Sequence, residues 1–276
     1  METKLALPVL KTLFSESWAL YKRHFQVLIS LSLIPALLSF AGNLFNKPGG
    51  NDQASIIGFV LTLASIVLGI IAYLGLVYVI KDGVQMNAAL AAGAKQFFPY
   101  LWLSILSTLV LAGGFVMAIV PGIIFSIWFS FSIFAFLVDG KRGLEAVLKS
   151  KEYVFGYFWL VFGRLFMLII IAFPILIFTS FIAKGDFEVN VVMALFQAFF
   201  TPFALCYSFI LYSQLKNLKP DIAANPVAVK KGFYIFSAVL GILAGVALLV
   251  TALVFIPKLA ERYNQQLLEN NSGQVR

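Results

Sequence analysis

Seven long apolar stretches run through this chain of 276 residues, and Arg164 is the only charged residue inside any of them. A charged side chain at the bilayer centre costs about 3 kcal/mol or more, so segments built in this way are suited to hydrocarbon. The chain is 61% hydrophobic and only 12% charged, whereas soluble domains are about one quarter charged. We therefore expect an all-α polytopic integral membrane bundle that forms a single membrane domain over residues 1–276.

The apolar stretches predict helices rather than strands. Continuous apolar runs satisfy every backbone group in lipid only as helices, and barrel strands would alternate in polarity. The predicted spans are Phe25–Phe45, Ser55–Ile80, Tyr100–Val120, Gly122–Val138, Phe158–Ala183, Val191–Tyr212 and Phe233–Ile256, followed by a polar C-terminal tail at residues 257–276.

Three shorter stretches have apolar residues on one side only. They are Val9–His24, Val84–Phe98 and Gly143–Tyr157, and each precedes a predicted span. Amphipathic helices of this kind lie in the interface plane with the apolar face toward the acyl chains. We expect these three at the inner interface.

The run from Tyr100 to Val138 is about twice as long as a helix needs to cross the hydrocarbon, so the chain must turn within it. Pro121-Gly122 is a turn signal, which predicts a tight hairpin at the outer face. The alternative is a re-entrant loop, which would reverse the orientation of every later segment.

The basic residues predict the orientation of the spans. With the N-terminus inside, the inner segments hold 14 of the 20 Lys and Arg residues, and the outer segments hold five. Basic residues concentrate in cytoplasmic loops. We therefore expect a multi-pass protein of the cell (inner) membrane, with a cytoplasmic N-terminus and the C-terminus outside.

Several short patterns occur together in one order. Val120-Pro121-Gly122-Ile123 leads an aromatic-rich span that ends at Asp139-Gly140, and Gly143-Leu144-Glu145-Ala146-Val147-Leu148-Lys149-Ser150 then precedes Gly156-Tyr157-Phe158-Trp159. Later, Pro202 lies in a span that closes with Leu211-Tyr212-Ser213-Gln214-Leu215-Lys216. Over residues 8–218 the chain resembles the membrane domain associated with bacterial glycerophosphodiester phosphodiesterases and its uncharacterised stand-alone relatives.

The resemblance implies a helical membrane domain of six spans, so a seventh span would be a departure from the family. It implies no phosphodiesterase activity, because the catalytic barrel of those enzymes has no counterpart in this chain. The family also offers no established catalytic residues to place on the sequence.

The candidate contacts for a lipid phosphate or another anion are basic. They are Arg164, about 9 Å into its span, and the loop residues Lys149, Lys151, Lys230 and Lys231. The alternative for Arg164 is that its long side chain extends back to the interface.

Residues for catalysis, cofactors or metals are sparse. His24 is the only histidine and Cys206 the only cysteine, and no phosphate loop or metal-ligand spacing occurs. Glu145 and Lys149 have the spacing of a helical ion pair, and Asp139-Gly140 has the composition of a turn. We therefore expect no enzyme activity, cofactor, metal or nucleic-acid partner.

Uncharged polar residues inside the spans suggest either a polar path or ordinary helix contacts. They are Gln197, Ser104, Ser107, Thr108, Ser126, Ser130, Ser132 and Thr201. Ser237, Gly241 and Gly245 form a ridge of small residues in the last span, suited to helix packing within the chain or between two copies.

The first functional hypothesis is a non-enzymatic scaffold, adaptor or envelope-maintenance factor that contacts lipid, with anionic lipid on its inner face. The alternative is a transporter, pore or lipid-moving protein. The spans lack charge at their centres, which favours small apolar or lipid cargo over ions.

Overall fold

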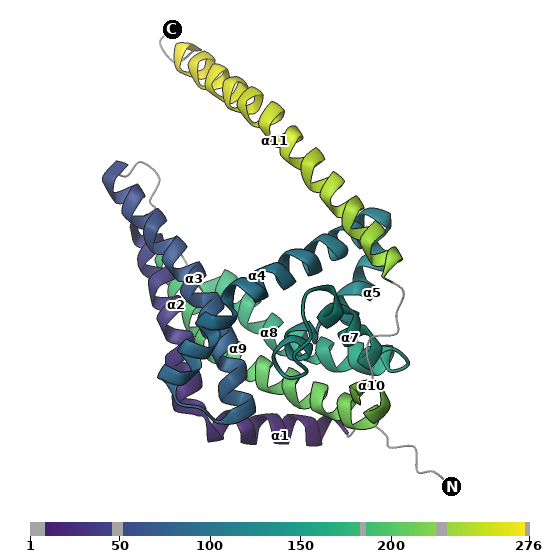
Figure 1. The fold of residues 1–276 in the computed structure, drawn as a ribbon. Helices are drawn as coiled ribbons and strands as arrows, with labels where there is room; N and C mark the ends of the chain where they lie inside the picture. The colour runs from purple at the N-terminus through teal and green to yellow at the C-terminus, as the bar shows by residue number, and fades with distance from the viewer. Residues whose placement is uncertain (1–8, 46–51, 183–185, 225–230, 274–276) are drawn as a thin grey trace. The chain divides into compact units, whose positions relative to one another are not determined.

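The computed structural model describes residues 9–45, 52–182, 186–224 and 231–273, and these contain helices and connecting turns but no β-strand (Figure 1). The helices are α1 Leu10–Arg23, α2 Phe25–Phe45, α3 Asp52–Asp82, α4 Met86–Met117, α5 Ile119–Phe129, α6 Ser132–Leu137, α7 Leu144–Val154, α8 Phe158–Ile182, α9 Asp186–Leu218, α10 Pro220–Ala224 and α11 Gly232–Gly273. The all-α fold expected from the sequence is confirmed.

Seven helical segments in the described part of the chain are long and apolar enough to cross a membrane. They are α2, α3, α4, the pair α5–α6, α8, α9 and α11. Each corresponds to one of the seven predicted spans, which identifies the chain as a multi-pass integral membrane protein.

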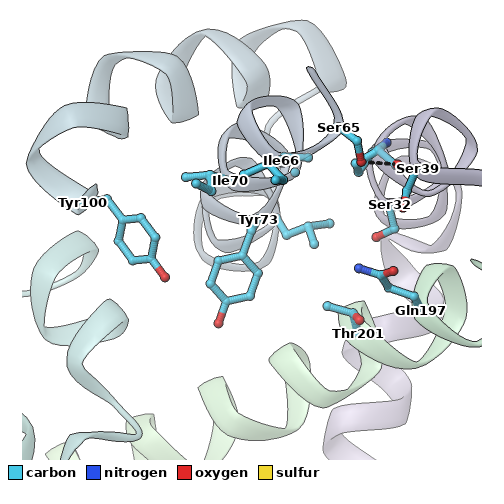
Figure 2. A pocket seen from close by; sticks show the side chains of 13 residues that line it. Ser32, Ser39, Ser65, Ile66, Ile70, Tyr73, Tyr100, Gln197 and Thr201 are labelled. Atoms are coloured by element: carbon cyan, nitrogen blue, oxygen red, sulfur yellow. Dashed lines mark hydrogen bonds between the residues drawn. The ribbon is translucent and has the colours of Figure 1, made fainter. Parts of the chain in front are cut away.

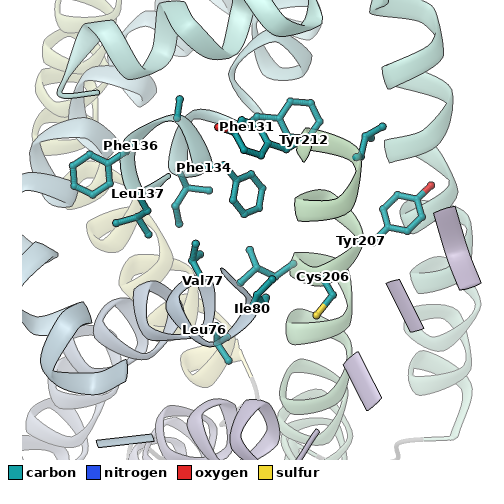
Figure 3. Close-up of a cluster of buried hydrophobic side chains, with 14 of the residues drawn as sticks. Leu76, Val77, Ile80, Phe131, Phe134, Phe136, Leu137, Cys206, Tyr207 and Tyr212 are labelled. Atoms are coloured by element: carbon teal, nitrogen blue, oxygen red, sulfur yellow. The ribbon is translucent and has the colours of Figure 1, made fainter. Parts of the chain in front are cut away.

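The chain forms two compact units. The larger unit comprises residues 1–104 and 127–229, and its core joins α3, α6 and α9. In Figure 3, Val77 and Ile80 of α3 face Phe134 of α6, with Cys206 and Tyr212 of α9 beside them. The smaller unit comprises residues 105–126 and 230–276.

Helix α9 packs against α2 along its first half and against α1 along its second half. Its first half runs antiparallel to α2, because Phe187 packs on Phe40 near one end and Phe199 packs on Phe25 near the other. Its second half follows α1, where Gln214 donates a hydrogen bond to Glu16. The chain turns sharply at His24, between α1 and α2 (Figure 1). Because α9 packs along both helices, it must bend between its two halves. Pro202 lies at that point, and proline is the usual cause of a sharp bend in a helix.

Two of the three predicted amphipathic helices are separate elements, namely α1 and α7, whereas the prediction for Val84–Phe98 is wrong. That stretch is continuous with the following span as the first part of α4. It packs along α3, where a side chain on Gly93 would collide with the backbone of Ile71 and one on Gly75 would crowd Ala89. Small residues allow this close approach of the two backbones, and the run of alanines in the sequence carried that signal.

The predicted hairpin is present in the smaller unit, but the break comes at Ala118 rather than at Pro121-Gly122. A Cβ atom placed on Gly114 would lie 3.4 Å from the Cα atom of Gly122, whereas a straight helix would separate these residues by about 12 Å. Proline interrupts a helix at the carbonyl four residues earlier, which here belongs to Met117, the last residue of α4. Pro121 itself is accepted in the first turn of α5, where few amides need a partner.

The fourth predicted span, Gly122–Val138, is not one continuous helix. It breaks at Ser130 and Phe131, between α5 and α6. At the break, the Ser150 hydroxyl of α7 accepts a hydrogen bond from the Phe131 amide at 3.1 Å and donates one to the Trp128 carbonyl at 2.6 Å. Ser150 is completely buried, so a side chain far along the sequence satisfies the backbone groups that the break exposes.

Helix α11 includes both the last span and most of the predicted polar tail, because it continues to Gly273. Within the smaller unit, the Ser237 hydroxyl donates to the Val110 carbonyl at 2.8 Å, and Gly241 lies directly against the Leu109 carbonyl. Gly245 has open space around it. The ridge of small residues therefore packs within the chain through Ser237 and Gly241, and homo-oligomerisation through Gly245 stays a prediction.

Candidate functional site

A cavity of about 410 Å³ lies between α2, α3, α4 and α9 in the larger unit. Its polar lining consists of three serines, two tyrosines, one glutamine and one threonine, namely Ser32, Ser39, Ser65, Tyr73, Tyr100, Gln197 and Thr201. In Figure 2 the rings of Tyr73 and Tyr100 enter from one side, and Ser32, Gln197 and Thr201 lie on the other. None of the lining residues carries a charge.

The cavity reaches the centre of the spans. Pro35, which lines it, is ten residues from each end of α2, or roughly 15 Å along the helix. Ser65 and Gly69 occupy the middle of α3 in the same way. Hydroxyl groups at this depth have no lipid partner, so they must bond within the protein, to water or to a ligand.

Three of the four helices carry a proline at the level of the cavity. Pro35 belongs to its wall, Pro99 precedes Tyr100 on α4, and Pro202 follows Thr201 at the bend of α9. Proline removes a backbone donor and opens the helix locally. The three helices stay continuous across these prolines, and the carbonyl that each proline leaves without its helical donor can accept a hydrogen bond from elsewhere.

Some of the polar side chains already have partners. The Ser65 hydroxyl donates to the Pro35 carbonyl at 2.8 Å, and the Ser32 hydroxyl donates to the Leu28 carbonyl at 3.0 Å. A hydroxyl that donates in this way still has acceptor capacity. Together with the Gln197 amide, the wall can exchange hydrogen bonds with an uncharged guest.

A second cavity of about 210 Å³ adjoins the first and shares Tyr73 and Thr201 with it. It adds two more hydroxyls, those of Ser130 and Ser208. The polar lining therefore continues from the centre of α2 and α3 to the break between α5 and α6.

The structure brings together three of the eight uncharged polar residues that the sequence singled out. Gln197 and Thr201 line the first cavity, and Ser130 lines the second. Ser32, Ser39, Ser65, Tyr73 and Tyr100 were missed. Hydropathy gives no signal for them, because isolated serines and tyrosines are common in spans.

An aromatic groove of about 510 Å³ lies between α1, α2, α8 and α9, also in the larger unit. Its walls include Trp18, Phe25, Leu195, Phe199 and Phe203. The Tyr21 hydroxyl donates to the Phe199 carbonyl at 3.3 Å, so the polar group of the only tyrosine in the lining is already bonded. The groove therefore offers apolar contact rather than hydrogen bonding.

The carboxylate of Asp139 is almost buried, and its role is larger than the turn that the sequence predicts. It pairs with the Lys216 ammonium at 2.5 Å and accepts a hydrogen bond from the Tyr153 hydroxyl at 2.9 Å. Burial raises the pKa of Tyr153, and the neighbouring Asp139 raises it further. These contacts tie the end of α6 to α7 and α9.

Two candidate lipid contacts, Lys149 and Lys151, lie on α7. Lys149 is fully buried, hydrogen-bonded to the Ile222 carbonyl of α10 and 3.7 Å from the Glu152 carboxylate. Burial lowers the pKa of Lys149, and Glu152 partly offsets this. Lys149 therefore joins α7 to α10, while the Lys151 ammonium lies 4.7 Å from the ring centroid of Trp128. A lipid contact of either lysine stays a prediction.

Arg164 is also enclosed, at 7% exposure, and its carbonyl accepts a hydrogen bond from Tyr207 at 3.0 Å. Its side chain therefore lies within the bundle rather than extending freely to the interface, and a contact with anionic lipid stays a prediction. Lys231 is exposed, and Lys230 lies outside the described residues.

In the part of the chain that the structure describes, no group of three or more His, Cys, Asp or Glu residues could hold a metal ion. The cavities contain no nucleophile paired with a base. No protein family, curated protein or solved structure matches this chain. The resemblance to the phosphodiesterase-associated membrane domain therefore stays a prediction, and the cavity carries the functional argument.

Proposed function

We propose that this protein is a non-enzymatic membrane carrier, which moves an uncharged cargo with hydrogen-bonding groups and an apolar body. The observation that supports the proposal is the cavity midway along α2 and α3, walled by hydroxyls and one amide. Polar residues at the centre of spans are expensive, and they commonly mark a substrate path.

The lining indicates the class of cargo. A charged molecule at this depth would need an opposite charge or strong dipoles, and no charged residue lines the cavity. Ile66 and Ile70 add apolar wall beside the hydroxyls. A polyol, a lipid with an uncharged head or a similar amphiphile fits both features.

Flux into proteoliposomes tests the proposal with two probes, glycerol followed by light scattering and a fluorescent glucosylceramide, whose sugar head is uncharged, followed by dithionite quenching. We expect one probe to move faster than in empty liposomes. Replacing Gln197→Leu together with Thr201→Val should slow it about thirtyfold, because each lost hydrogen bond to the cargo is worth roughly 1 kcal/mol. Thr251→Val, which removes an exposed hydroxyl on α11, is the matched control. Rates equal to those of empty liposomes for both probes would refute the carrier.

The scaffold or adaptor role is a second candidate, and α11 is the observation that favours it. This helix has 42 residues and is about 63 Å long, roughly twice the hydrocarbon thickness. Its final residues therefore extend beyond the bilayer, where a partner could bind them. A truncation after Pro257 that leaves flux unchanged but abolishes a cellular phenotype would support this role.

We also propose that the protein lies in the inner membrane with its N-terminus in the cytoplasm. The support is the charge asymmetry of the connecting segments. An odd number of spans then places the end of α11 outside.

A further inference from the structure

The aromatic groove has a cationic residue, Lys22, at one end. Lys22 and Arg23 close α1 and are exposed, and the Lys22 ammonium lies 5.8 Å from the ring centroid of Trp18, which lines the groove. Neither Lys22 nor Arg23 forms an ion pair within the described residues. A positive charge therefore lies next to the aromatic groove.

The acidic residue of α1 lies away from this end. Glu16 is two residues before Trp18, which places it on roughly the opposite side of the helix. There it accepts a hydrogen bond from Gln214 of α9. The charged group that α1 places at this end of the groove is therefore a positive one.

The groove itself is shaped for hydrocarbon. Trp18, Leu195 and Phe199 are each about half exposed, whereas Phe203 at its base is only 8% exposed. With the Tyr21 hydroxyl bonded to the Phe199 carbonyl, little in the lining would exclude an acyl chain. Aromatic side chains are also the residues that gather at the level of lipid headgroups.

We propose that this groove is a binding site for one anionic phospholipid, with an acyl chain along Phe199 and Phe203 and the phosphate at Lys22. The site is separate from the cargo cavity and does not depend on the carrier function. It also differs from the basic residues that the sequence offered as lipid contacts, because Lys22 is not among them.

Quenching of Trp18 by brominated acyl chains tests the site directly. The protein needs a variant in which Trp18 is the sole tryptophan, made by Trp102→Phe, Trp128→Phe and Trp159→Phe. In mixed vesicles, brominated phosphatidylglycerol should half-quench Trp18 at about one fifth of the mole fraction that brominated phosphatidylcholine needs, the effect expected of one lysine near the membrane surface.

Lys22→Glu in that background should abolish the preference for phosphatidylglycerol. Lys95→Glu changes an exposed lysine of α4 that does not line the groove, and it should preserve the preference. Equal quenching by the two lipids in the variant that keeps only Trp18 would show that the groove contacts bulk lipid without selecting a headgroup. That result would overturn the proposal. A preference that survives Lys22→Glu would overturn it as well.

Discussion

Ser150→Ala should destabilise the protein by about 2–6 kcal/mol, because two backbone groups at a helix break lose a hydrogen bond and each loss costs roughly 1–3 kcal/mol. The groups are the Phe131 amide and the Trp128 carbonyl, both bonded to the Ser150 hydroxyl at the break between α5 and α6. Alanine removes only the hydroxyl oxygen, so the loss comes mainly from hydrogen bonding rather than from a cavity. Unfolding followed by circular dichroism in detergent measures the change.

Ser132→Ala is the matched control. Ser132 is also buried and close to the same break, but its hydroxyl donates only to the Phe129 carbonyl within three residues. Its loss should cost about 1 kcal/mol or less, since a local bond of this kind is easily replaced. Equal effects of the two substitutions would contradict the assigned role of Ser150.

Gly241→Leu should separate α11 from α4 in the smaller unit. A side chain at this position would overlap the Leu109 carbonyl and lie 3.1 Å from the Gly113 amide nitrogen. Because these neighbours are backbone atoms, they cannot move aside as a side chain would. The expected cost is about 3 kcal/mol, at the upper end for overpacking, visible as a lower midpoint of thermal unfolding.

Gly245→Leu provides the comparison one helical turn along. Gly245 meets nothing within 4 Å, so leucine at this position would face open space and the midpoint should stay within experimental error. If Gly245→Leu were the more damaging change, the ridge would be packing against a second copy of the chain at that position.

Much of the fold followed from hydropathy because the bilayer allows so few alternatives. The seven spans and the amphipathic helices α1 and α7 were predicted from run length and helical spacing alone. The errors have local causes. Val84–Phe98 contains enough polar residues to appear interfacial, but Gly93 and Ala89 let it pack closely on α3. The hairpin break was misplaced because Pro121 ends the preceding helix at Met117, four residues before the proline itself.

The candidate site was much less predictable. Its residues come from four helices, and only Gln197 and Thr201 were among the polar residues singled out from the sequence, because nothing in the sequence separates a serine that lines a cavity from one that does not. The same holds for Lys149 and Asp139, whose partners Ile222 and Lys216 come from distant segments. Burial and pairing of such groups depend on tertiary contacts, which a single sequence does not reveal.

The central claim is that the cavity midway through the spans is lined by polar groups and holds water. Thiol labelling tests this claim most directly. In a Cys206→Ala background, Ser39→Cys places a thiol in the cavity wall, and Leu37→Cys places one on the exposed face of the same helix. Maleimide reacts with the thiolate, which forms in water and not in hydrocarbon. In proteoliposomes the account predicts rapid labelling of Ser39→Cys and little labelling of Leu37→Cys, whereas no labelling of Ser39→Cys, or equal labelling of both, would contradict it.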